Sequence, residues 1–127
     1  MFYKFFFIII AISLILCGGC INRVPLYSCK NASFSSTGSK MSLKERTQKI
    51  TLYAKNKNWN TKIIKPGEIA AFYSGVNYSC KVLIEYDKNK FNIYYISSNH
   101  MFYNPEKHSI HIQYNYLIRE LENTLKK

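Results

Sequence analysis

The stretch YSCKVLIEYDKNKFNIYYIS, residues 78–97, decides the fold because its side chains change character with a period of two. In its first half Lys81 and Glu85 stand between apolar residues, which is typical of a strand with one buried and one solvated face. The apolar positions are Cys80, Val82, Ile84 and Tyr86, and Ile93 and Tyr95 continue the buried face in the second half. The polar residues 87–90 form a short connection, which predicts an antiparallel hairpin.

Two further β-rich runs precede this hairpin, at residues 59–64 and 69–74. Pro66-Gly67 follows the first run, and Gly75-Val76-Asn77 follows the second. Glycine and proline mark turns, and connections this short join antiparallel neighbours. The four runs therefore predict an antiparallel meander of three to four strands.

A helix is predicted on each side of the meander. Ser42-Leu43-Lys44-Glu45 fits a capping box, so we expect a helix from 43 to 56. A second helix is expected from 109 to 125, because its apolar residues recur at helical spacing. This second stripe consists of Ile110, Tyr114, Leu117, Leu121 and Leu125. Both stripes can be buried on one sheet face, which predicts a two-layer α+β domain over 41–127 with the C-terminal helix packed on that face.

The composition agrees with one small folded domain. The chain has 127 residues, too few for a large multi-site enzyme. Its hydrophobic fraction of 47% excludes disorder of the whole chain.

Residues 1–19 are expected to be a secretory signal peptide. Lys4 precedes an apolar run from Phe5 to Leu16 that only Ser13 interrupts. A run of about 12 residues is shorter than the roughly 20 that a membrane-spanning helix needs.

The signal ends in Leu16-Cys17-Gly18-Gly19-Cys20, which resembles the lipobox of bacterial lipoproteins. The resemblance implies that Cys20 becomes the lipidated first residue of the mature protein. The polar composition of residues 20–40 then predicts a tether between lipid and domain. Ile21 follows the cysteine where an Asp would retain a Gram-negative lipoprotein at the inner membrane, so the resemblance implies the outer membrane, facing the periplasm. The alternative is an ordinary secreted, soluble protein.

The remaining cysteines, Cys29 and Cys80, are a possible disulfide pair, since an exported protein enters an oxidising compartment. The alternative is that Cys80 is a buried apolar residue and Cys29 a free thiol.

Several segments resemble a family of small Gram-negative envelope lipoproteins of unassigned function. The matching positions are Trp59, Pro66-Gly67, Ile69, Ala71, Val82, Ile84, Tyr86, Phe91, Ile93, Tyr95, Ser97-Ser98, and the closing Ile110-His111, Tyr114 and Asn115. Family members tend to carry other residues at Asn58, Tyr78, His100 and Leu117. The resemblance implies a location and a domain organisation, and it implies no reaction.

No pattern in the sequence indicates catalysis. His100, His108 and His111 lack a carboxylate at a spacing suited to a zinc site, so we expect no metal and no cofactor. No glycine-flanked serine or cysteine–histidine signature is present, and the acidic residues are scattered singly. We therefore expect a protein that is not an enzyme.

Polar and aromatic residues converge if the fourth strand packs near the last helix. These residues are Tyr86, Tyr95, Ser98, His111, Tyr114 and Asn115. They predict either a small polar or glycan-binding pocket or a core with satisfied tyrosine hydroxyls.

The chain is strongly basic, with 18 Lys and Arg against 7 Asp and Glu. Lysines 40, 44, 49, 55, 57, 62 and 65 suggest a basic face toward anionic lipid or an envelope polymer. Nucleic acid is the usual partner for such a charge, but an exported protein does not meet it. Alternatively, the charge only keeps the domain in solution.

These patterns together favour a non-enzymatic envelope lipoprotein, attached to the membrane through Cys20, that contacts an envelope protein or an anionic polymer or surface. The second hypothesis is a secreted, soluble, basic protein that binds glycans or host molecules.

Overall fold

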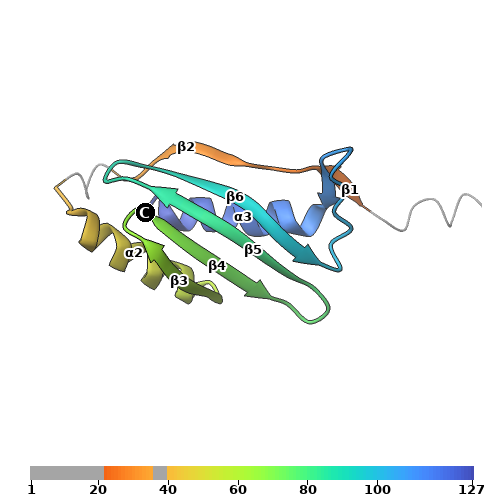
Figure 1. Cartoon of the computed structure of the whole chain (residues 1–127), viewed down its shortest axis with the longest axis horizontal. Coiled ribbons are helices and arrows are strands. Elements are labelled where there is room, and N and C mark those ends of the chain that lie inside the picture. The colour runs from red at the N-terminus through yellow and green to blue at the C-terminus, as the bar shows by residue number, and fades with distance from the viewer. Residues whose placement is uncertain (1–21, 36–39) are drawn as a thin grey trace, which may run out of the picture.

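The computed structural model describes residues 22–35 and 40–127 (Figure 1). The expected signal peptide and Cys20 lie outside these residues. Within these residues the fold consists of two helices and two antiparallel sheets, which confirms the predicted α+β class. The elements are β1 (Arg23–Pro25), β2 (Cys29–Ser33), α2 (Leu43–Asn56), β3 (Trp59–Lys65), β4 (Glu68–Ser74), β5 (Ser79–Tyr86), β6 (Lys90–Asn99), β7 (Ser109–His111) and α3 (Ile112–Leu125).

The larger sheet has five strands in the order β2-β6-β5-β4-β3. Strands β3 to β6 form a meander, in which the alternating face of β5 pairs Val82 with Tyr95 and Ile84 with Ile93. Strand β2 adds a fifth strand beside β6, and β1 pairs with β7 in a separate two-stranded ribbon. In Figure 1 both helices lie behind the large sheet.

The expectation of a tether over residues 20–40 is corrected for residues 23–33, which form β1 and β2. Cys29, Ala32 and Phe34 belong to the hydrophobic core. Periodicity missed β2 because its buried residues lie three positions apart, with a register shift between them and Asn31 at a φ of 54°. The folded domain therefore includes residues 22–35, which precede the expected start at 41.

Helix α2 begins as the capping box predicts. The Ser42 hydroxyl accepts a hydrogen bond from the Glu45 amide at 3.1 Å, and the helix covers residues 43–56. At the other end of the chain, all five residues of the predicted apolar stripe are buried. Helix α3 starts at Ile112, because residues 109–111 pair with β1 as strand β7.

Within the described ranges no helix is both long and apolar enough to span a membrane.

Candidate functional site

One end of the molecule, called the β1 end below, is where the described chain begins. It comprises β1, β7, the start of α3, the β4–β5 turn and the loop 100–108 (Figure 1). The backbone amide of Ile112 donates to the carbonyl of Asn22 at 2.9 Å, so the first described residue is bonded to the start of α3.

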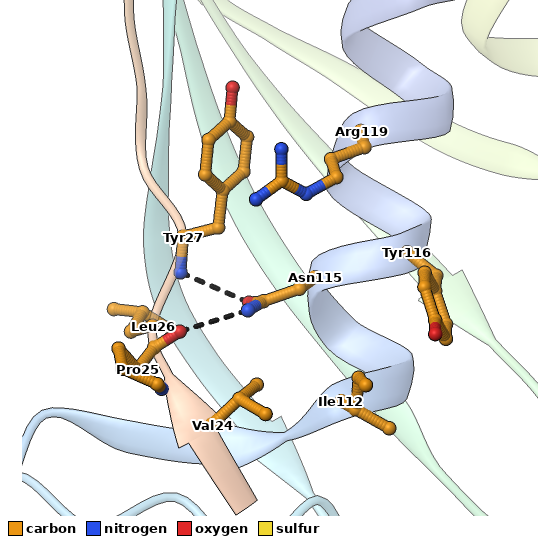
Figure 2. Close-up of a pocket in the computed structure, with 8 residues that line it drawn as sticks. All are labelled: Val24, Pro25, Leu26, Tyr27, Ile112, Asn115, Tyr116 and Arg119. Carbon is orange, nitrogen blue, oxygen red and sulfur yellow. Dashed lines mark hydrogen bonds between the residues drawn. The ribbon is translucent and has the colours of Figure 1, made fainter.

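A groove of about 480 Å³ lies at this end, between α3 and the segment that follows β1 (Figure 2). Asn115 forms its floor: its side-chain oxygen accepts from the Tyr27 amide at 3.0 Å, and its nitrogen donates to the Pro25 carbonyl at 2.9 Å. Both polar atoms of this buried side chain are thereby satisfied. The groove is lined by Val24, Pro25, Leu26, Tyr27, Ile112, Asn115, Tyr116 and Arg119.

The two charged groups beside the groove, on Arg119 and Glu122, both contact Tyr27. The Arg119 guanidinium lies 4.1 Å from the centre of the Tyr27 ring, and the Tyr27 hydroxyl donates to Glu122 at 2.6 Å. This hydrogen bond and burial raise the pKa of Tyr27 to about 12. Burial acts to raise the pKa of Glu122, but hydrogen bonds from Cys29, Tyr27 and Lys126 hold it below its usual value. The arrangement suits a structural network, because Glu122 is a weak base there.

A second depression, of about 320 Å³, lies where the β4–β5 turn meets the loop 100–102 and the start of α3. His111 caps α3 here, since its Nδ1 accepts from the Gln113 amide at 3.1 Å. The lining residues are Asn77, Tyr78, His100, Met101, Phe102, His111 and Gln113. This depression shows that the β4–β5 turn lies beside the loop.

The loop 100–102 has an unusual backbone. His100 and Phe102 have φ values of 59° and 55°, a left-handed conformation that is rare for a bulky side chain. Between them, Met101 is buried and its carbonyl accepts from the His111 amide at 2.8 Å. The buried Met101 holds the loop in place, whereas the Phe102 side chain lies outward, with 49% of the residue exposed. Strained residues of this kind concentrate at functional sites.

The β4–β5 turn presents a second apolar side chain at the same end. Val76 is 96% exposed. The turn is closed by a hydrogen bond from the Gly75 amide to the Tyr78 carbonyl at 2.8 Å, and a Cβ on Gly75 would stand 2.4 Å from the Tyr78 ring. The close approach of this ring to Gly75 keeps Val76 at the tip.

The six residues of the predicted polar and aromatic pocket do not meet at one site. Tyr95, Ser98 and Tyr114 do come together: the Tyr95 hydroxyl is 2.8 Å from the Ser98 oxygen, and the Tyr95 and Tyr114 rings are 5.5 Å apart. Tyr86 lies elsewhere, where its hydroxyl bonds to Thr47 of α2. His111 and Asn115, as described above, hold α3 and the β1 segment. The cluster around Tyr95 packs against the core, which favours the core interpretation over the pocket. The Tyr95 hydroxyl is satisfied by Ser98, but the Tyr114 hydroxyl has no hydrogen-bond partner among the described residues.

The predicted disulfide is corrected, because Cys29 and Cys80 are free, buried thiols. Cys29 is opposite Ile93 and Cys80 is opposite Ser98, so they lie roughly 15 Å apart along β6. A disulfide needs Cα atoms within about 7 Å. Burial raises the pKa of each thiol to about 12, which makes both unreactive at neutral pH.

The histidines do not form a metal site with other ligands. Across residues 22–35 and 40–127, no group of three or more His, Cys, Asp or Glu side chains is close enough to hold an ion.

The predicted basic residues lie on another side of the molecule. Lys44, Lys49, Lys55 and Lys57 are on or directly after α2, and Lys62 and Lys65 are on β3, which packs beside α2. We call this surface the lysine side. Sequence reasoning missed the β1 end, although the exposed Val76 between Gly75 and Asn77 was a readable signal.

The chain matches no protein-family model, no curated protein sequence and no solved structure.

Proposed function

We propose that this protein is a non-enzymatic bacterial envelope lipoprotein, attached through a lipidated Cys20 to the outer membrane and facing the periplasm. Its domain contacts an envelope protein or an anionic surface there. The proposal includes no cofactor, no metal and no nucleic acid.

The observation that carries this proposal is the place where the lipobox meets the fold. Asn22 is bonded to the start of α3, and Cys20 precedes it by only two residues. The described chain from Asn22 onward is therefore part of the folded domain, which supports a domain held close to an anchor at Cys20. Two or three acyl chains bury enough methylene groups to hold such a domain stably at a bilayer.

The chemistry of the described residues supports a binding role over catalysis. Glu122 accepts hydrogen bonds from its neighbours, and the thiols of Cys29 and Cys80 are buried in the core. His111 accepts a backbone hydrogen bond with Nδ1. These groups are occupied in holding the fold, whereas a general base or a nucleophile must be within reach of a substrate.

Labelling with radioactive palmitate in a Gram-negative host tests the anchor. The wild-type chain should incorporate the label and sediment with the membranes, and Cys20→Ala should lose both properties. Cys17→Ala is the matched control, because it removes a neighbouring cysteine and should keep the label. A wild-type chain that carries no lipid and stays in the soluble fraction would overturn the proposal.

The lysine side favours one alternative, a secreted protein that binds anionic glycans. In that case the protein would leave the cell without a lipid. The palmitate experiment would then find the wild-type chain unlabelled and in the soluble fraction.

A further inference from the structure

We propose that the β1 end is the surface with which the protein lies on an anionic lipid bilayer, with Val76 and Phe102 at the acyl boundary and Arg23 and Lys107 among the headgroups. This inference rests on the proposed lipidation of Cys20, and it identifies the part of the domain that meets the membrane.

The length of chain between the lipid and the fold sets the geometry. Two residues extend at most about 7 Å, and the hydrogen bond from Ile112 holds Asn22 on the domain. The acyl chains on Cys20 must lie in the bilayer. The start of α3 and the β1–β7 ribbon are therefore within a few ångströms of the headgroups.

The same geometry places the other end of the molecule away from the bilayer. Helix α3 has 14 residues and is about 20 Å long, and it begins at the β1 end. Charges at its far end are separated from the headgroups by more than the Debye length of roughly 8 Å at physiological ionic strength. Electrostatic attraction to the headgroups is therefore strongest for the charges of the β1 end.

The side chains of the β1 end have the chemistry of a membrane interface. Val76 is almost completely exposed at the tip of its turn, and Phe102 points outward from a strained loop. Tyr116 adds a third exposed side chain, whose ring in Figure 2 points toward the start of α3. Apolar and aromatic side chains with a basic residue beside them are typical of protein surfaces that enter the headgroup region.

The charges of this end complement anionic headgroups. The Arg23 guanidinium lies 5.6 Å from the centre of the Phe102 ring, so a cation and an apolar ring are presented together. Lys107 lies in the adjoining loop, where Glu106 is the only acidic residue. Glu45, Glu68, Glu85, Asp87, Glu120 and Glu122 are placed on other parts of the fold.

Nitroxide labelling of single cysteines tests this orientation. The full-length chain, processed and lipidated in cells, is reconstituted in vesicles of phosphatidylethanolamine and phosphatidylglycerol. Val76→Cys and Phe102→Cys report on the β1 end. Leu52→Cys on α2 and Ile64→Cys on β3 are matched controls on the lysine side, since these apolar residues are 55% and 53% exposed. The wild-type chain, with its two buried thiols, sets the labelling background.

At positions 76 and 102 we expect accessibility to a water-soluble nickel chelate to fall about threefold relative to positions 52 and 64, with a rise in accessibility to oxygen. Equal accessibility at all four positions in vesicle-bound protein would overturn the orientation and leave the anchor intact. Protection at 52 and 64 instead would assign the membrane contact to the lysine side. A chain that carries no lipid and does not sediment with the vesicles would overturn the proposed function, and this inference with it.

Discussion

The two ends of the molecule differ in which side chains are buried and bonded within the fold and which are exposed. At the end opposite β1, called the Arg46 end, the guanidinium of Arg46 is buried, with its carbon 3.9 Å from the centre of the Phe34 ring, and it donates to the Lys88 carbonyl at 3.0 Å. The β5–β6 turn there is closed by Asp87, whose carboxylate accepts from the amides of Asn89 and Lys90. At the β1 end, Val76 and Phe102 are exposed.

The backbone shows the same difference. His100, Phe102 and His108 all have positive φ values and lie in one loop of the β1 end. Left-handed conformations cost free energy in residues other than glycine. Both ends expose apolar side chains, since Ile63 and Ile64 at the end of β3 are 56% and 53% exposed. The β1 end differs because three residues with positive φ lie in one loop there beside its exposed apolar side chains, which is the pattern of a binding surface held by a rigid scaffold.

The largest effect is expected from Arg46→Ala, which removes the interactions that join α2 to the residues after β2 and to the β5–β6 turn. Only 2% of Arg46 is exposed, so the substitution leaves a cavity and an unpaired carbonyl at Lys88. We expect the free energy of unfolding in urea to fall by about 3 kcal/mol. Lys44→Ala, an exposed change on the same helix, should alter it by less than about 0.5 kcal/mol.

Arg46 also shows how far the sequence could predict the fold. The capping box at Ser42 and the apolar stripe of α3 were sufficient for those elements, because each is a local pattern. Arg46 was missed because a charged residue on a helix is normally exposed, and only the ring of Phe34 and the carbonyl of Lys88 make its burial favourable. Strand β2 was missed because its bulge disturbs the period of two.

The candidate site was predicted less well for a related reason. His111 and Asn115 were predicted to belong to one polar and aromatic pocket, but they bond to the backbone and do not line one pocket with Tyr86. Their partners, such as Pro25 and Tyr27, come from a segment expected to be a tether. Contacts between residues about 90 positions apart leave no local signal in a single sequence.

The second prediction concerns the attachment of the β1 segment to α3. Asn115→Ala removes two hydrogen bonds to the backbone, at Tyr27 and Pro25, and should lower the free energy of unfolding by about 2 kcal/mol. The Tyr27 amide should also exchange its proton with solvent faster. Asn115→Asp retains the acceptor for this amide but not the donor to Pro25, so the amide should stay more protected than in the alanine variant. If the Tyr27 amide exchanged its proton at the wild-type rate in Asn115→Ala, the β1 segment would be held to α3 by other contacts.

Two tyrosines should respond with opposite signs to the loss of their hydroxyls. The Tyr114 hydroxyl is buried near the start of α3 without a hydrogen-bond partner among the described residues, so Tyr114→Phe should raise the free energy of unfolding by about 1 kcal/mol. The Tyr86 hydroxyl bonds to Thr47, so Tyr86→Phe should lower the free energy of unfolding by a similar amount. A loss of stability in both variants would show that the Tyr114 hydroxyl has a partner after all. Thermal and urea unfolding measure both changes.

The smallest effect is expected at Phe102, a bulky residue with a positive φ. Phe102→Gly removes a ring that is half exposed and, at a φ of 55°, relieves a conformation that glycine adopts without strain. The two contributions are similar, so the free energy of unfolding should change by less than about 1 kcal/mol.

Phe72→Gly is the matched control for this last change, because Phe72 is 36% exposed but lies in the extended strand β4. Glycine there weakens the strand, and the free energy of unfolding should fall by about 1 kcal/mol or more. Equal destabilisation in the two variants would mean that the Phe102 ring stabilises the fold by packing. A neutral Phe102→Gly would mean instead that the packing of the ring only offsets the strain of its backbone. The fold would then gain no net stability from holding this ring outward, as expected of a side chain that serves a contact outside the domain.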